Sequence, residues 1–215
     1  MTLKNRFRFE KEISHGFDGS LASWMTDAST GAATLSTETT MGGRALMDTG
    51  GTQGDAARVD MGPFTPDAAG RFGVFGFEVT FGFGGNVGVY DDANVGIGFE
   101  DGAGNSIVHQ PVNSPSSGAA NVAVSNAGTE TLLPTRNIIP SGAVTSGIYW
   151  DYASGELYHR YQDAFGNRLT DASALPDPTL DYTPFVSIEN PDGTANDTMF
   201  LYHVNILYGI SPNPI

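Results

Sequence analysis

Three groups of aspartate and asparagine residues have the composition of a calcium-binding loop. Hard cations such as Ca²⁺ are held by several oxygen ligands that one loop gathers. Tight turns need the same residue types, so a plain turn explains each group as well as a bound Ca²⁺ does. The candidate ligands are Asp91, Asp92 and Asn94; Asp101 and Asn105; and Asn190, Asp192, Asn196 and Asp197.

Aromatic and acidic residues on both sides of position 150 have the chemistry to bind a sugar. Glycan recognition uses exposed rings beside polar groups, and a tyrosine can expose its ring and hydroxyl together. On an extended strand, Trp150 points to one face while Tyr149 and Asp151 point to the other. We expect Trp150 in the core, with a surface platform as the alternative. The predicted glycan-binding residues are Tyr149, Asp151, Tyr158 and Tyr161.

The sequence contains none of the common catalytic motifs. It has no Gly-x-Ser-x-Gly elbow, no His-Glu-x-x-His and no glycine-rich phosphate loop with a lysine. Its histidines are scattered, so a catalytic triad would have to assemble in space; they are His15, His109, His159 and His203. We therefore predict a protein that is not an enzyme.

The elements that must position these residues are β-strands. Phenylalanine and valine alternate with small or polar residues over Phe75–Phe83, which predicts a strand with one buried face. The same period recurs over Val95–Phe99 and Phe200–Tyr208, and no segment of comparable length shows a helical period. Shorter strands are expected at 32–37, 44–47, 57–61, 87–90, 148–152, 156–161 and 185–188. The predicted fold class is an all-β, antiparallel sandwich.

Two segments differ from this pattern. Residues 1–12 carry a net charge of +2 and the rest of the chain −16, so this end is either a first strand or a basic arm that docks on an acidic neighbour. Residues 111–147 form a long segment with Glu130 and Arg136 as its only charges. We expect it to be an insertion with short strands at 121–124 and 131–133, either a functional loop or a plain one. The whole chain, 1–215, is expected to be a single domain.

The composition narrows the class of partner. Asp and Glu number 24 against 10 Lys and Arg, a net charge of −14, and the chain has no cysteine. Such an acidic surface stays hydrated in high salt. The protein therefore comes either from a halophilic source or from a mesophilic one in which it is simply an acidic surface protein. Phosphate contacts need clustered Lys and Arg, so we expect no nucleic acid. No apolar stretch is long enough to predict membrane insertion or a secretory signal.

The order of these parts resembles the concanavalin-A-like lectin and glucanase jelly rolls, laminin-G-like modules included. The resemblance covers most of the chain. It rests on Phe17–Trp24, on Gly42–Leu46, on the hairpin Tyr149–Tyr158 and on a last strand that returns beside the first. It implies a jelly-roll sandwich, with calcium near a sugar site as in the lectins. The glucanases use a Glu-x-Asp-x-x-Glu strand, which this sequence lacks, so hydrolysis by that route is not expected.

Together these features predict a non-catalytic structural or recognition component of a larger extracellular or virion assembly, such as a turret, spike, decoration or tail protein. Its expected partners are copies of itself, neighbouring structural proteins and cell-surface glycans. We expect the protein to be located outside the cell or on a virion surface, and to reach that place without a signal peptide. The alternatives are a free carbohydrate-binding, lectin-like module and a glycoside-cleaving enzyme.

Overall fold

The computed structural model describes residues 7–39, 43–67, 70, 72–84, 93–111, 120–135, 142–161, 164–169, 175–193 and 197–210, with side chains left out at 161 and 164–169. Within these ranges the chain forms strands and no α-helix, and therefore no helix that could span a membrane. The strands are β1 (Arg8–Gly16), β2 (Met25–Asp27), β3 (Thr34–Glu38), β4 (Arg44–Asp48), β5 (Ala56–Met61), β6 (Val74–Phe83), β7 (Asn94–Glu100), β8 (Ser106–Gln110), β9 (Asn121–Asn126), β10 (Thr129–Pro134), β11 (Val144–Asp151), β12 (Glu156–Tyr161), β13 (Ala164–Leu169), β14 (Thr183–Glu189) and β15 (Thr198–Ile210).

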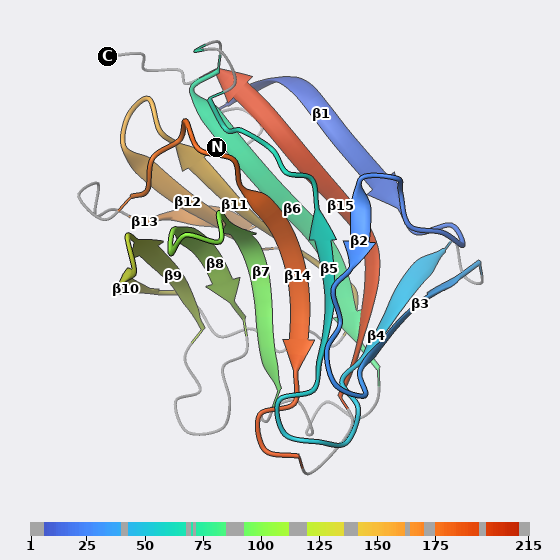
Figure 1. The fold of residues 1–215 in the computed structure, drawn as a ribbon. Coiled ribbons are helices and arrows are strands. Elements are labelled where there is room, and N and C mark those ends of the chain that lie inside the picture. Colours follow the sequence, from blue (N-terminus) through green and yellow to red (C-terminus); the bar gives the residue numbers. More distant parts are fainter. Residues whose placement is uncertain are drawn as a thin grey trace.

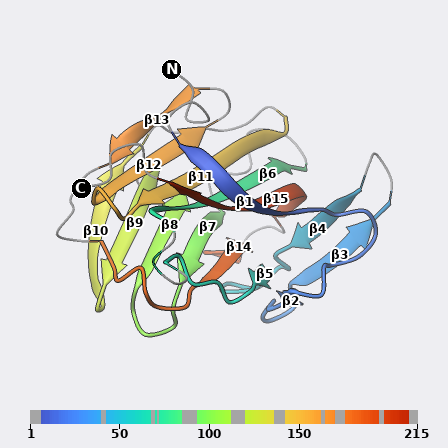
Figure 2. The ribbon, with the colours of Figure 1, turned by 90° about the horizontal axis from the view of Figure 1, so that it is seen from above.

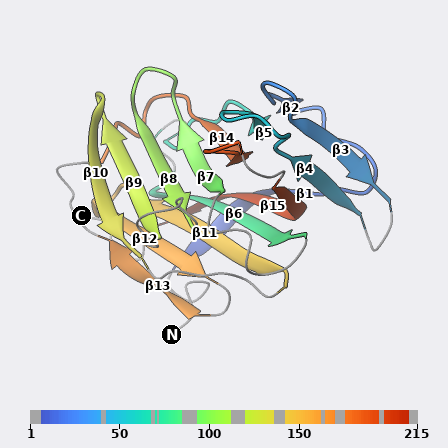
Figure 3. The same ribbon diagram turned by 90° about the horizontal axis from the view of Figure 1, so that it is seen from below.

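These strands pack as two antiparallel sheets, one in front of the other (Figures 1 and 2). The β6 sheet has the order β13-β12-β11-β6-β15-β4-β3, and β1 pairs with β15 beyond the end of β4. The β7 sheet has the order β10-β9-β8-β7-β14-β5-β2, which Figure 3 shows as a separate layer. The prediction of an all-β, antiparallel sandwich is confirmed.

The first and last strands are neighbours. β1 pairs with β15 from Arg8 opposite Ile210 to Gly16 opposite His203, with a bulge after Phe9. The expected first strand, and the expected return of the last strand beside it, are both confirmed. This pairing brings Phe7, which precedes β1, to the outer face of the β6 sheet.

The core lies between the sheets and is rich in aromatic rings. Phe75 of the β6 sheet meets Phe99 of the β7 sheet edge to face at 5.3 Å, and Trp150 stacks on Phe99 at 6.0 Å. Trp150 is 1% exposed, so its predicted place in the core is confirmed. Inward-facing residues of both sheets form one continuous hydrophobic cluster, as the alternation of the strands requires.

β6 is buried on both faces, whereas the alternation of its sequence predicted one buried face and one exposed face. Its outward-facing residues Gly76 and Glu78 are also shielded from solvent. Tyr149 of β11 lies directly over Gly76, where an added Cβ would come within 3.0 Å of its ring. Phe7 in turn packs on Tyr149, so a second small cluster covers this part of the outer face.

The described part of residues 111–147 belongs mainly to the sheets and is not an irregular insertion. β9 and β10 form a hairpin, closed by Ala127 and Gly128 at φ values of 50° and 78°, as a two-residue turn matching the strand twist requires. The short strands expected at 121–124 and 131–133 are confirmed. Residues 112–119 and 136–141, and the expected strand at 87–90, lie outside the described ranges.

Candidate functional site

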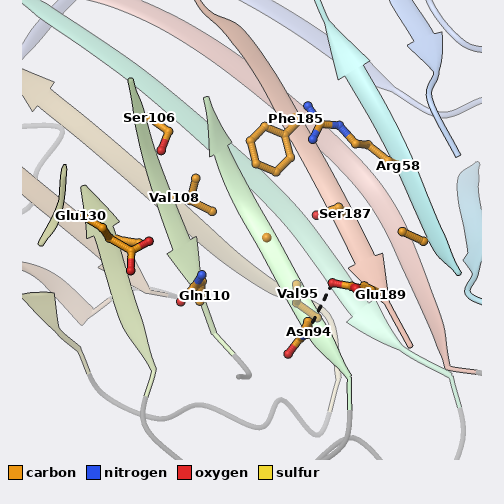
Figure 4. A pocket seen from close by; sticks show the side chains of 13 residues that line it. Arg58, Asn94, Val95, Ser106, Val108, Gln110, Glu130, Phe185, Ser187 and Glu189 are labelled. Atoms are coloured by element: carbon orange, nitrogen blue, oxygen red, sulfur yellow. Dashed lines mark hydrogen bonds between the residues drawn. The ribbon is translucent and has the colours of Figure 1, made fainter. Parts of the chain in front are cut away.

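A groove of about 390 Å³ crosses the outer face of the β7 sheet (Figure 4). It is lined by side chains from β5, β7, β8, β9, β10 and β14. Those lining residues are Ala56, Arg58, Asn94, Val95, Gly96, Ser106, Val108, Gln110, Ala123, Glu130, Phe185, Ser187 and Glu189. Most of them are the outward-facing members of alternating strands, so the groove follows from the same period that builds the core.

β14 shows how the alternation sets the groove. Val186 and Ile188 point into the core, while Phe185, Ser187 and Glu189 point outward and line the groove. The strand register then places Phe185 beside Gly98 of β7, Gly98 beside Val108 of β8, and Val108 beside Ala123 of β9. The floor therefore consists of a row of residues from adjacent strands.

Glycines on β7 leave this part of the sheet surface without side chains. A Cβ on Gly96 would sit 2.8 Å from the Ser187 hydroxyl and 3.2 Å from the Phe185 ring. At Gly98 a Cβ would overlap the backbone of Ile107 and Val108. Glycine is required at both places by the close approach of neighbouring atoms, and a ligand can lie close to the strands.

Arg58 forms one wall of the groove. Its guanidinium lies over the Phe185 ring at 4.0 Å, and its Nε and Nη2 donate to Asp60 at 2.5 Å and to Glu100 at 2.6 Å. Burial opposes the charge, but the hydrogen bonds to Asp60 and Glu100 outweigh it, so the pKa of Arg58 lies above its ordinary value. The result is a rigid, planar surface whose positive charge is already matched.

Two further carboxylates line the groove on strands that are far apart in the sheet. Glu189 on β14 accepts a hydrogen bond from Asn94 Nδ2 at 3.5 Å, and Glu130 on β10 is exposed (Figure 4). β14 and β10 are separated by β7, β8 and β9, so the two strands lie about 19 Å apart at the usual strand spacing. The paired carboxylates of glycosidases lie about 5–9.5 Å apart, so these two cannot form such a pair.

The predicted exposure of Tyr149 and Tyr158 is wrong. They are 1% and 2% exposed, because Phe7 packs against both rings, at centroid distances of 6.1 Å and 5.4 Å. The pattern correctly separated Tyr149 from the core face of β11. It did not show that the opposite face is also covered, since the covering residue comes from the far end of the chain.

The hydroxyl of Tyr149 belongs to a buried polar network. It donates to Glu78, which also accepts a 2.5 Å ion-pair contact from Arg160 Nη1. Burial, followed by the negative charge of Glu78, raises the pKa of Tyr149 far above its ordinary value. Each of these buried polar groups has a partner, so the network stabilises the fold and presents no open binding group.

The other two predicted glycan-binding residues are not at a described surface either. Asp151 is buried and accepts the backbone N–H of Ser154 at 3.2 Å, which closes the β11–β12 turn. The side chain of Tyr161 lies outside the described part of the structure. Tyr149, Asp151 and Tyr158 do not line the groove.

The described candidate metal ligands serve turns. Asp101 accepts N–H groups of Ala103 and Asn105 and the Asn105 amide, at 2.8, 3.0 and 2.6 Å. Partial burial opposes ionisation, but the Asn105 and Ala103 hydrogen bonds outweigh it and lower the pKa of Asp101. Asn190 likewise accepts the N–H groups of Asp192 and Gly193.

The remaining candidate ligands are dispersed. The backbone N–H of Asp197 donates to Thr49 Oγ1, Asn94 lies in the groove, and Asp91, Asp92 and Asn196 fall outside the described ranges. Among the described residues, no three His, Asp or Glu side chains gather as a metal site requires.

Two of the four histidines meet in the interior. His109 Nδ1 and His159 Nε2 both face the hydroxyl of Ser146, at 2.8 and 3.3 Å, and the rings lie 3.9 Å apart. All three residues are buried, and His109 Nε2 has no hydrogen-bond partner among the residues that the structure describes. Burial lowers the pKa of His159 to about 4, and burial with the neighbouring ring lowers that of His109. This cluster is closed to a substrate, so it is not a working triad.

Solved structures identify the architecture that carries the groove. The structure of a Bacillus licheniformis beta-glucanase matches with a TM-score of 0.64 at 11% identity, covering 91% of this chain and 97% of that chain. The Emp47p carbohydrate recognition domain matches with a TM-score of 0.61 at 12% identity, covering 96% and 98%. The chain has the concanavalin-A-like jelly-roll fold. The expected jelly roll is therefore confirmed.

This concanavalin-A-like fold is shared by proteins of different activities. A Crh5 transglycosylase in complex with NAG matches with a TM-score of 0.62 at 15% identity, covering 94% of this chain and 85% of that chain. No family model matches the sequence, and no curated protein matches it. The neighbours include both enzymes and carbohydrate-binding domains, so their likeness establishes the jelly roll, and the class of activity has to be argued from the groove.

The groove residues of this jelly roll were missed by the sequence interpretation. The alternation of Thr183–Glu189 and of Ala56–Met61 shows which residues point outward. It does not show that β5, β14, β7 and β8 are neighbours, which is what brings Arg58, Phe185 and Glu189 together.

Proposed function

We propose that this domain binds carbohydrate, without catalysis, in the groove across the β7 sheet. The observation that carries the proposal is the groove itself, an open channel floored by Gly96, Val108 and Ala123. Its walls offer the Arg58–Phe185 stack beside hydroxyl, amide and carboxylate groups. Glycan sites combine a flat apolar or cationic surface with such polar groups, and the likeness to carbohydrate-binding domains supports the same assignment.

The arrangement of acidic groups supports binding over cleavage. Glu189 and Glu130 are too far apart to act as acid and nucleophile on one bond. Asp60 and Glu100 both bind Arg58, at 2.5 and 2.6 Å, and neither of them lines the groove.

A blocked-groove variant tests this function. Ser187→Trp places a large ring over Gly96 on the outer face and leaves the core unchanged. Ser36→Trp is the matched control, because Ser36 is exposed on β3 of the other sheet. Binding to a panel of immobilised oligosaccharides should be present in the wild type and in Ser36→Trp and absent in Ser187→Trp. A wild type that binds no oligosaccharide, or a Ser187→Trp protein that binds normally, contradicts the proposal.

We also propose that the domain works inside a larger extracellular or virion assembly, with copies of itself or other structural proteins as neighbours. β10 is the end strand of the β7 sheet and carries Leu132, which is 52% exposed. An apolar side chain on a sheet edge that no described strand pairs supports contact with another chain. The mass of the protein in solution, measured for the wild type and Leu132→Lys, tests this role. A monomeric wild type at high concentration argues against self-assembly and favours a free lectin-like module.

A further inference from the structure

We propose that the groove selects glycans that carry protonated amino groups, such as polymers of de-acetylated amino sugars, over neutral and acidic glycans. This inference rests on the proposed carbohydrate-binding function and adds the charge class of the ligand. It follows from the positions of the charges in and beside the groove.

The groove has more negative than positive charge. Arg58 is the one basic side chain that lines it among the described residues, and Asp60 and Glu100 both bind that guanidinium. Glu130 and Glu189 also line the groove, and neither has a basic partner in the described part of the chain. A bound cation can therefore contact two carboxylates whose charge is not balanced by a described basic side chain, whereas a bound anion finds no available cation among the described lining residues.

The spacing of these carboxylates favours separate charges on an extended ligand. Glu189 and Glu130 stand on strands about 19 Å apart, so one small cation cannot bridge them. A linear polymer lying along the groove can place one ammonium group near each. Ser106 on β8 lies between these two strands and can bind a ring hydroxyl, and the Arg58–Phe185 surface, on β5 and β14, offers a flat face to a sugar at the Glu189 side.

The charge of the whole protein acts in the same direction. A net charge of −14 creates a negative potential that repels uronate or sulfated glycans and attracts cationic ones. This attraction is screened by salt, so selectivity for the amino glycan should fall as ionic strength rises.

The test compares oligomers that differ in the charged group. The probes are the hexamers of glucosamine, N-acetylglucosamine and galacturonic acid, measured by titration calorimetry at about pH 6, where an amino group is protonated. We expect the glucosamine hexamer to bind about tenfold more tightly than the N-acetylated one, and the galacturonate hexamer to bind least. Glu189→Gln and Glu130→Gln should each lower the ratio between the first two affinities about threefold. Glu10→Gln, an exposed change on β1 of the other sheet, should leave that ratio unaltered.

The outcomes separate this inference from the proposed function. Equal binding of the glucosamine and N-acetylglucosamine hexamers overturns the amino-glycan selectivity and leaves the groove as a glycan site. A ratio that Glu189→Gln and Glu130→Gln do not change also overturns it, because the selectivity then arises elsewhere. Binding of neither hexamer, nor of any oligosaccharide in the panel, overturns the proposed function as well.

Discussion

The buried histidine pair should make the fold less stable as the pH falls from about 6.5 to about 4. His109 and His159 share the single hydroxyl of Ser146, which can satisfy two neutral rings by donating to one and accepting from the other. An added proton turns a ring into a cation in a site without a described carboxylate partner. The unfolded chain accepts that proton at the ordinary pKa of about 6.5, so acid favours the unfolded state.

The size of the effect follows from the shifted pKa. The pKa of His159 is lowered from 6.5 to about 4. The stability that this shift contributes is fully present above pH 6.5. By linkage, about 2 kcal/mol of it is lost at pH 5, and about 3 kcal/mol when the pH has fallen through 4. The shift of His109 has the same sign, so it adds to the loss.

Urea unfolding, followed by the fluorescence of buried Trp150, measures this loss between about pH 7.5 and pH 5. His159→Gln keeps a polar side chain beside Ser146 but cannot titrate, so the variant should lose about 2 kcal/mol less than the wild type over this range. His203→Gln, on β15, leaves the pair in place and should behave as the wild type. Equal losses in the wild type and His159→Gln would refute the reasoning.

Three further outcomes are expected. Phe7→Ala should lower the free energy of unfolding in urea by about 3 kcal/mol, because it uncovers Tyr149 and Tyr158; an unchanged midpoint contradicts the capping role. Tyr149→Phe should cost about 2 kcal/mol in the same assay, since it removes a buried hydrogen bond to the Glu78 carboxylate, and a neutral effect would show that the bond contributes nothing. The unfolding temperature should rise between low salt and molar KCl, because ions screen a net charge of −14; a flat trend removes the argument for a saline habitat.

The fold class was readable because it depends on local periodicity. Alternation over Phe75–Phe83 and Phe200–Tyr208 leaves a strand as the one regular element that buries all the large side chains on one side. The two short apolar runs at 121–124 and 131–133 predicted strands in the same way, but the hairpin that pairs β9 with β10 was not predicted. The low charge of residues 111–147 was interpreted as the mark of an insertion. Part of that low charge has another cause, because β9 is an apolar strand of the β7 sheet.

The candidate site could be predicted from the sequence to a smaller extent than the fold class. Alternation showed correctly that Tyr149 and Trp150 occupy opposite faces of one strand. It assigned the outer face to solvent, but Phe7 covers it after β1 pairs with the last strand. The aspartate and asparagine groups had two local explanations. Hydrogen bonds to backbone N–H groups show that Asp101 and Asn190 hold turns, and the calcium sites stay a prediction.

By itself, then, the sequence determined where most of the strands run, although not β2, β8 and β13, which of their residues face inward, and that the surface is acidic, because each of these depends on neighbours along the chain. The tertiary structure alone decided which strands are adjacent. Backbone hydrogen bonds pair any two strands equally well, so adjacency depends on how all the side chains pack at once. That choice placed Arg58 on Phe185, brought Glu189 and Glu130 into one groove, and enclosed His109 with His159.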